Sequence, residues 1–178
     1  MAATSVLESI NIGFLTVLHE PTGYLGGYLV VNIWGRPLEF RLSTAVQPNR
    51  VQQILYGGTL EPYICADLIG KTLVEKTGLP IQLVLTDCAM ALDLRLRIDV
   101  PVVWLAPVGE TPAGFGDPVC STTKSSGAVF AHPRHLEDRS IIRDLLKQLE
   151  ATLDLAEPLA RIREAISEAR KMGVTKSA

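Results

Sequence analysis

The residues of this sequence that could do chemistry gather in its later half. His132 and His135 stand three positions apart in AVFAHPRHLEDRS, residues 128–140, and Cys120 lies twelve residues before His132. Zinc accepts histidine nitrogen and cysteine sulfur as ligands, and a cysteine beside a histidine base can serve as a nucleophile. Cys120, His132 and His135 are therefore candidate metal ligands and candidate catalytic residues.

The same spacing also fits a structural role. Pro133 between the two histidines indicates an extended or turning segment, in which the two rings do not share a helical face. One cysteine with two histidines is a poor match to structural zinc patterns, and no catalytic signature surrounds Cys120. In this favoured interpretation residues 128–140 are a strand end, a proline turn and the start of a helix, and we expect no metal and no cofactor.

Asp87 is a further acidic candidate because of its position. It follows the apolar run IQLVLT, residues 81–86, which is typical of a strand covered on both faces. Open α/β sheets bind their ligands at the carboxyl ends of such strands. The alternative is that Asp87 caps a helix beginning at Cys88.

Other motifs give weaker signals. Glu39-Phe40-Arg41 is only a distorted version of the Glu-x-Lys arrangement of carboxylate–lysine nucleases, and a solvated cross-strand pair explains it as well. GYLGGY, residues 23–28, and TTKSSG, residues 122–127, lack the spacing or the following helix of a phosphate-binding loop.

Three strands at the start of the chain are predicted to form an antiparallel meander. Apolar or alternating runs at 10–19, 24–34 and 37–45 are separated by the turn sequence EPTG and by Gly35-Arg36. Gly26-Gly27, just before the apolar part of the second run, indicates a bulge or a close backbone approach.

A β-α-β unit is predicted to follow. Its strands are 81–86 and 100–107, and the connection 88–96 is long enough for a crossover helix. Alternating leucines leave a strand open for that connection, but Ala89, Met90 and Ala91 favour the helix. A further short strand is predicted at 128–131.

Helices and one loop complete the predicted architecture. Apolar periodicity and end signals predict helices near 49–56, 60–77, 140–155 and 158–171. The last two form a C-terminal helical pair within 138–172, and 107–127, rich in Gly, Pro, Ser and Thr, is a long surface loop. We expect one globular α/β domain over 1–178, with a mixed sheet, flanking helices and a C-terminal helical hairpin.

Composition and charge limit the cellular compartment and the classes of partner that we expect for this protein. The chain has 178 residues, a net charge of −2 and a sequence pI near 5.9, and its 17 Lys and Arg form no basic run, so nucleic acid is an unlikely partner. The sequence shows neither a secretory leader nor a long apolar segment, which predicts a cytoplasmic protein without membrane contact. Cys65 and Cys88 are expected to be reduced, buried packing residues.

The favoured functional expectation is a non-catalytic protein that binds a protein partner or self-associates. The candidate contact residues are aromatic side chains of the first third: Tyr24, Tyr28, Trp34, Tyr56 and Tyr63. The alternative is an enzyme or small-ligand-binding module, possibly hydrolytic or metal-dependent. In that alternative Asp87, Cys120, His132 and His135 converge at the carboxyl edge of the sheet.

Overall fold

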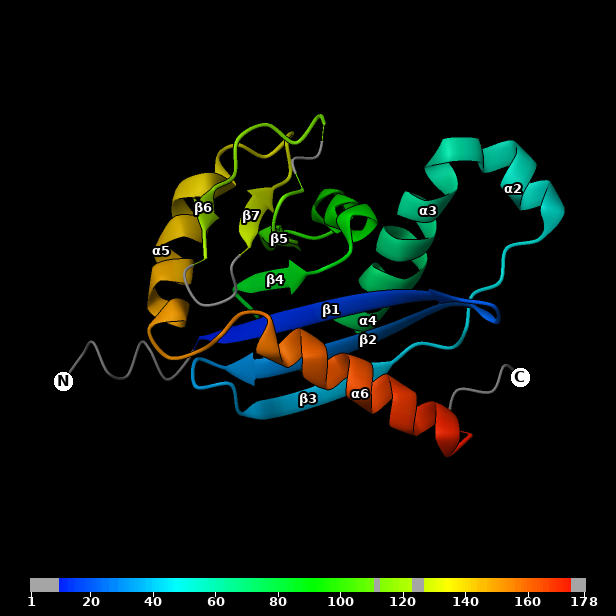
Figure 1. The fold of residues 1–178 in the computed structure, drawn as a ribbon, viewed down its shortest axis with the longest axis horizontal. Coiled ribbons are helices and arrows are strands. Elements are labelled where there is room, and N and C mark those ends of the chain that lie inside the picture. Colours follow the sequence, from blue (N-terminus) through cyan, green and yellow to red (C-terminus); the bar gives the residue numbers. More distant parts are fainter. Residues whose placement is uncertain (1–9, 111–112, 123–126, 174–178) are drawn as a thin grey trace.

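Within residues 10–110, 113–122 and 127–173, which the computed structural model describes, seven strands form one mixed sheet (Figure 1). Their order is β3-β2-β1-β4-β5-β7-β6, and helices cover both faces, which confirms the α/β prediction. The strands are β1 (Asn11–Glu20), β2 (Gly23–Asn32), β3 (Pro37–Leu42), β4 (Leu83–Thr86), β5 (Val102–Ala106), β6 (Cys120–Ser121) and β7 (Ala128–Ala131).

The predicted meander is confirmed. β2 pairs antiparallel with both β1 and β3, and the turn between β1 and β2 ends at Gly23, whose φ of 116° favours glycine. A side chain at Gly26 would overlap Ile69, and one at Gly27 would overlap Ile162. The double glycine therefore lets helices approach β2 closely on both of its faces.

The β-α-β unit is also confirmed. β4 runs parallel to β1 and to β5, with Leu15 opposite Thr86 and Thr86 opposite Trp104. The connection is helical, η3 (Ala89–Leu96), but it winds as a tight 3-10 helix with buried Leu92 and Leu94. Leu92 and Leu94, two of the alternating leucines, thus lie on the buried side of this helix.

The predicted loop 107–127 is partly strand. β6 pairs with β7, and β7 pairs antiparallel with β5, so Cys120 lies in an edge strand of the sheet. Residues 123–126, most of the TTKSSG segment, lie outside the described residues.

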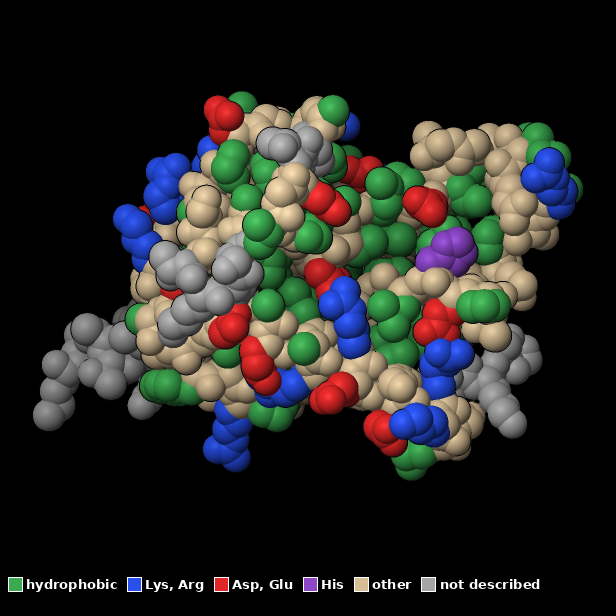
Figure 2. Space-filling model, in the orientation of Figure 1, with side chains coloured by type: hydrophobic (Ala, Val, Ile, Leu, Met, Phe, Trp, Pro, Cys, Tyr) green, Lys and Arg blue, Asp and Glu red, His purple; other side chains and the backbone are tan. Residues whose placement is uncertain are grey.

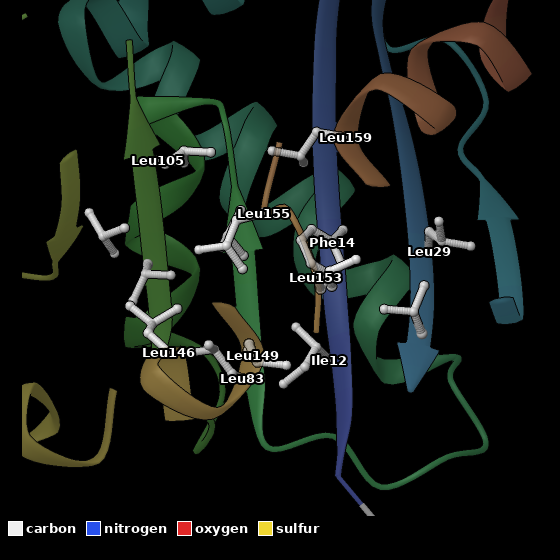
Figure 3. Packing of buried hydrophobic residues seen from close by; sticks show 14 of the residues in the cluster. Ile12, Phe14, Leu29, Leu83, Leu105, Leu146, Leu149, Leu153, Leu155 and Leu159 are labelled. Carbon is white, nitrogen blue, oxygen red and sulfur yellow. The ribbon is translucent and has the colours of Figure 1, made fainter. Parts of the chain in front are cut away.

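Two long helices cover one face of the sheet. α5 (Asp138–Glu150) and α6 (Glu157–Lys171) realise the predicted C-terminal pair, and α6 lies across β1 and β2 (Figure 1). Leucines of these helices and of the segment between them project onto strand residues such as Ile12, Phe14 and Leu83 (Figure 3). Burial of this apolar stripe holds the two helices on the sheet.

The other face is covered by η3 and by a helical stretch that realises the prediction for 60–77. The middle of this stretch, η2, winds as a π-helix, a geometry that is rare and often found at functional sites. None of the described helices combines the length and the apolar character needed to span a membrane. The segments are α2 (Arg50–Tyr56), η1 (Gly57–Thr59), α3 (Leu60–Pro62), η2 (Tyr63–Lys71) and α4 (Thr72–Glu75).

Candidate functional site at the carboxyl edge of the sheet

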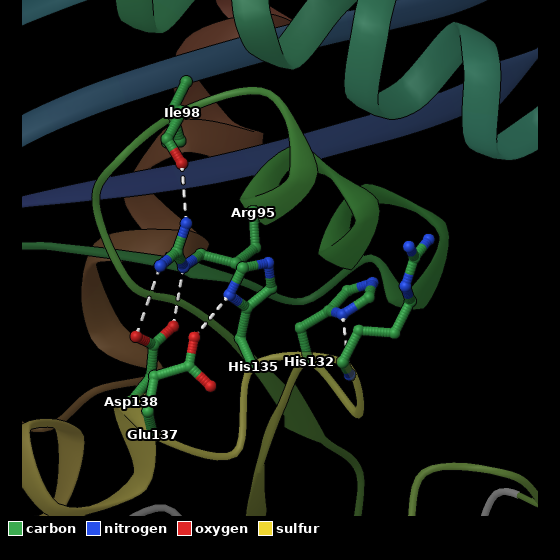
Figure 4. Close-up of polar contacts among 7 residues, drawn as sticks. Arg95, Ile98, His132, His135, Glu137 and Asp138 are labelled. Carbon is green, nitrogen blue, oxygen red and sulfur yellow. Dashed lines mark hydrogen bonds and ion pairs between the residues drawn. The ribbon is translucent and has the colours of Figure 1, made fainter.

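His132 lies away from Asp87 and makes structural hydrogen bonds. Because β7 runs antiparallel to β5, His132 is level with the amino end of β5, whereas Asp87 follows the carboxyl end of β4. Nδ1 of the buried His132 accepts the backbone N–H of Arg134 at 3.1 Å (Figure 4), and its Nε2 lies 3.1 Å from a carboxylate oxygen of Asp93. Both ring nitrogens are occupied, so His132 is not poised as a base.

His135 and Cys120 do not complete a site with His132. Nδ1 of His135 lies 2.8 Å from a carboxylate oxygen of Glu137, and its ring meets the ring of His132 edge to face. Cys120 packs against the core beneath α5, whereas His132 contacts Asp93 of η3 on the other face. The structure therefore does not bring Cys120, His132 and His135 together with Asp87, as the alternative function would require. Across the part of the chain that the structure describes, no three His, Cys, Asp or Glu side chains are placed to hold a metal.

An ion pair fixes the segment that follows the histidines. Asp138 receives two hydrogen bonds from the Arg95 guanidinium, at 2.6 and 3.3 Å, and Arg95 also donates to the carbonyl of Ile98 at 2.9 Å (Figure 4). The carboxylate of Asp138 thus ties α5 to η3 and makes no capping bond to its own helix. Residues 128–140 are thus the end of β7, a turn and the start of α5, as the favoured interpretation of this segment has it, and an ion pair fixes the helix start.

Asp87 does lie at the carboxyl edge, on the face covered by α6. Its carboxylate is 2.5 Å from a guanidinium nitrogen of Arg163, and it does not cap η3, where Cys88 occupies the cap position. Burial raises the pKa of Asp87, and the charge of Arg163 and the hydroxyl of Thr16 offset part of that rise. Glu20, at the end of β1, pairs in the same way with Arg170.

The two acidic residues on the α6 side of this edge, Asp87 and Glu20, are thus neutralised by arginines of α6. Acidic and basic side chains stand beside one another over this face of the molecule (Figure 2). The acidic groups on this side of the edge hold the helix in place, which leaves the opposite side for ligand chemistry.

On the opposite side of the same edge, three polar groups converge. The exposed ring of His19 stacks on the buried ring of Tyr24, with centroids 4.1 Å apart and planes within 5°. The Tyr24 hydroxyl donates to a carboxylate oxygen of Glu61 at 3.0 Å. Burial and the Glu61 carboxylate raise the pKa of Tyr24 to about 12, so its hydroxyl keeps its proton at neutral pH.

A cavity of about 390 Å³ opens beside these groups. It lies between the β1–β2 turn and the helical arm formed by α2 and η1, which stands away from the sheet (Figure 1). This volume is within the usual range for small-ligand pockets, roughly 300 to 1,000 Å³. Residues from both sides line it: His19, Glu20, Pro21, Gly23, Tyr24, Gln47, Pro48, Gln53, Gly57, Leu60 and Glu61.

Two cysteines lie in the apolar cluster behind this cavity. Cys65, one helical turn after Glu61, is buried in η2, and Cys88 follows β4. The Cys65 thiol lowers the pKa of Cys88, against a rise caused by burial, and the Cys88 side chain and burial raise the pKa of Cys65. The sequence missed this pair because its members are far apart in the chain, and only the strand end before Cys88 hinted at it.

The predicted aromatic contact surface is dispersed. Tyr24 and Tyr28 are buried, Trp34 is exposed at the β2–β3 turn, and Tyr56 stacks on Tyr63 with ring centroids 4.8 Å apart. These five side chains therefore form no single surface.

No protein-family model matches the chain, and no curated protein does. Among solved structures it is similar to endonuclease V of Ciona intestinalis in complex with DNA containing an inosine, with 12% identity, 74% of this chain and 75% of that chain covered, and a TM-score of 0.44. Endonuclease V of Bacillus subtilis is 9% identical, with 68% of this chain and 63% of that chain covered and a TM-score of 0.40. Argonaute of Marinitoga piezophila, in complex with guide RNA, is 9% identical, with 70% of this chain and 22% of that chain covered and a TM-score of 0.34.

These matches correct two expectations drawn from the sequence. The similar structures are of proteins bound to or named for nucleic acid, which stands against a non-catalytic protein-binding or assembly role and against nucleic acid as an unlikely partner. Identities of 9 to 12% and TM-scores of 0.34 to 0.44 transfer no substrate and no catalytic residue to this chain. Function has to come from the groups of its own carboxyl edge.

Proposed function

We propose that this protein is an enzyme acting on a nucleobase-containing ligand, held in the cavity beside His19, Tyr24 and Glu61. The observation that carries the proposal is the position of a stacked aromatic pair and a carboxylate in one cavity at the carboxyl edge of the sheet. Open α/β sheets bind their ligands at this edge.

The imidazole of His19 supplies a platform for a planar ring. One of its faces rests on Tyr24, and its exposed side is available to the cavity that it lines. Aromatic side chains, histidine included, stack on unpaired bases. A base seated there gains stacking energy while Tyr24 keeps the imidazole plane fixed.

Glu61 and Tyr24 supply the polar chemistry. The Glu61 carboxylate accepts N–H groups of a base edge and can take a proton from an attacking water, as a general base does. The Tyr24 hydroxyl, protonated at neutral pH, orients that carboxylate through its 3.0 Å hydrogen bond. Hydrolysis is the reaction class that these two groups fit.

The proposal includes no metal step. Nucleases of the two-metal class need a cluster of ligand side chains. The edge carboxylates Asp87 and Glu20 instead pair with Arg163 and Arg170, and the described residues hold no three-member ligand group.

Binding of fluorescein-labelled single-stranded DNA and RNA, competed by inosine and adenosine, tests the proposal. Stacking is worth about 1–3 kcal/mol per base, so His19→Ala should weaken binding roughly 5- to 150-fold. Trp34→Ala, which removes an exposed aromatic ring far from the cavity, is the matched control and should bind as the wild type does.

Catalysis is followed separately, by separating the products of labelled oligonucleotides and free nucleosides after incubation with the protein. Glu61→Gln should bind ligand and lose turnover, because the amide cannot take a proton. Equal binding by the His19→Ala and Trp34→Ala variants, or no binding of any base-containing probe, would overturn the proposal.

A further inference from the structure

We propose that a second cavity, between the end of β3 and the helical stretch of η2 and α4, binds phosphate groups of a single-stranded nucleic acid whose base lies in the cavity beside His19. This inference rests on the proposed function and names its ligand class, a phosphodiester chain in place of a free base or nucleoside.

The side chains of this second cavity are suited to an anion. The cavity has a volume of about 320 Å³ and lies beside β3, the outermost strand on one side of the sheet (Figure 1). Two cations and three hydroxyl groups line it, and no carboxylate of the described residues does; they belong to Arg41, Lys76, Ser43, Thr44 and Thr72. Proteins contact the phosphate oxygens of nucleic acid with donors of these kinds.

The acidic residues that neighbour these cations in the chain already have partners. Glu39 pairs with Nε of Arg41, which leaves the two terminal nitrogens of the guanidinium for a ligand. Glu75 pairs with Lys71 at 3.7 Å. Lys76 is exposed and forms no ion pair with a carboxylate of the described residues. A phosphate can therefore bind both cations without displacing a carboxylate.

Backbone hydrogen bonds fix the segment that carries Ser43 and Thr44. The Ser43 N–H donates to the Gly26 carbonyl at 2.9 Å, and the Ser43 Oγ accepts the Gly26 N–H at 2.8 Å. The Ser43 hydroxyl therefore keeps its own proton for a ligand oxygen. Three residues later, Val46 and Tyr24 exchange two backbone hydrogen bonds of 2.8 Å. This wall of the cavity is thus in place before a ligand binds.

The two cavities meet at the bonds between Tyr24 and Val46. Val46 lines the second cavity, whereas Tyr24 and Gln47 line the cavity beside His19. A strand with one base stacked on His19 can therefore continue along residues 43–47 and reach the second cavity with its next phosphates.

The charges of the two cavities match the two parts of a nucleotide. Glu20 and Glu61 line the cavity beside His19, and none of its described lining residues is a lysine or an arginine. A phosphate there would be repelled, whereas Glu61 can accept an N–H of an uncharged base. Phosphates therefore favour the second cavity, which a free nucleoside would leave unfilled.

The experiment measures the affinity of the full-length protein for a labelled single-stranded oligonucleotide over a range of salt concentrations. Arg41→Gln and Lys76→Gln should each reduce the slope of log K against log salt by about 0.7 and weaken binding roughly eightfold at about 50 mM salt, because each removes the counterion release of one phosphate contact. Lys147→Gln makes the same change of net charge at an exposed lysine of α5 and should bind as the wild type does. Circular dichroism confirms that each variant is folded.

An oligomer of abasic deoxyribose phosphates tests the second cavity without any base. We expect the wild type and His19→Ala to bind it alike, and the double variant of Arg41→Gln and Lys76→Gln to bind it roughly 60-fold more weakly at the same salt concentration. If the abasic oligomer does not bind, or binds equally to the double variant and to Lys147→Gln, the phosphate cavity is overturned even where His19→Ala weakens oligonucleotide binding. If the charge variants weaken the binding of both probes but His19→Ala weakens neither, the proposed function fails and the phosphate cavity stands.

Discussion

The ion pair between Arg95 and Asp138 should be among the costliest polar contacts to break. Side-chain exposure is 13% for Arg95 and 8% for Asp138, and two hydrogen bonds join them at 2.6 and 3.3 Å. Asp138→Asn keeps the shape of the side chain and removes its charge. The guanidinium of Arg95 then stays buried with neutral acceptors in place of a carboxylate, namely the Ile98 carbonyl (Figure 4) and the amide oxygen of the new side chain.

The expected cost follows from that burial. Removing one partner of a buried ion pair costs about 3–5 kcal/mol, because the other charge stays desolvated without compensation. The bond to Ile98 keeps part of the guanidinium satisfied, which places the expected loss near the lower end, about 3 kcal/mol. The change also removes an acidic group from the first turn of α5, worth about 0.3–1 kcal/mol.

A neighbouring ion pair provides a matched control. Arg97, two residues after Arg95 and just beyond the end of η3, pairs with Asp67 at 3.0 Å, but the side-chain exposures are 49% and 23%. Exposed pairs contribute about 0.2–1 kcal/mol, so Asp67→Asn should cost no more than that.

Urea unfolding of the wild type and of both Asn variants measures the two losses at a common m value. Arg95→Met combined with Asp138→Asn should cost at least about 1 kcal/mol less than the sum of the two single changes, because the members of the pair are coupled. Equal losses of unfolding free energy for Asp138→Asn and Asp67→Asn would refute the reasoning, because burial would then not determine how much an ion pair stabilises the fold.

Three further changes test the packing and the electrostatics. Tyr28→Phe should leave stability unchanged or raise it by about 1 kcal/mol in urea unfolding, because its buried hydroxyl has no hydrogen-bond partner within the described residues. A loss of that size would reveal a partner. Gly26→Ala should cost about 1–3 kcal/mol through overlap with Ile69, whereas Gly78→Ala, with open space around it, should cost less than about 1 kcal/mol. Burial raises the pKa of Asp87 above its ordinary value of 3.8, so the folded chain binds more protons there than the unfolded chain, and the contribution of this carboxyl to stability falls as pH rises through that window. The stability of Asp87→Asn relative to wild type should accordingly improve from pH 3 to pH 7, and a constant or declining difference would contradict the assigned direction.

Local patterns were sufficient to predict most of the fold. The apolar runs and the turns between them marked the meander and the strands of the β-α-β unit, and helical periodicity marked α5 and α6. Gly26-Gly27 signalled a close approach because a missing side chain is itself a local fact. Such patterns work because a strand or helix must show the core a face that its own residues determine.

The candidate site depended on strand order and on the two faces of the sheet, which the sequence does not encode locally. Cys120 and His132 are close in the chain, yet they pack on opposite faces. Cys65 and Cys88 are distant in the chain, yet the packing of η2 on η3 places them in one apolar cluster.

The sequence by itself thus determined the type and bounds of most elements and the place of Asp87 at a strand end. Tertiary structure alone decided that Arg163 neutralises Asp87, that His19 stacks on Tyr24, and that Cys65 and Cys88 pack in one apolar cluster. The physical reason is that secondary structure follows from side-chain patterns a few residues long. Contacts between elements follow instead from how whole apolar faces fit together in the folded core.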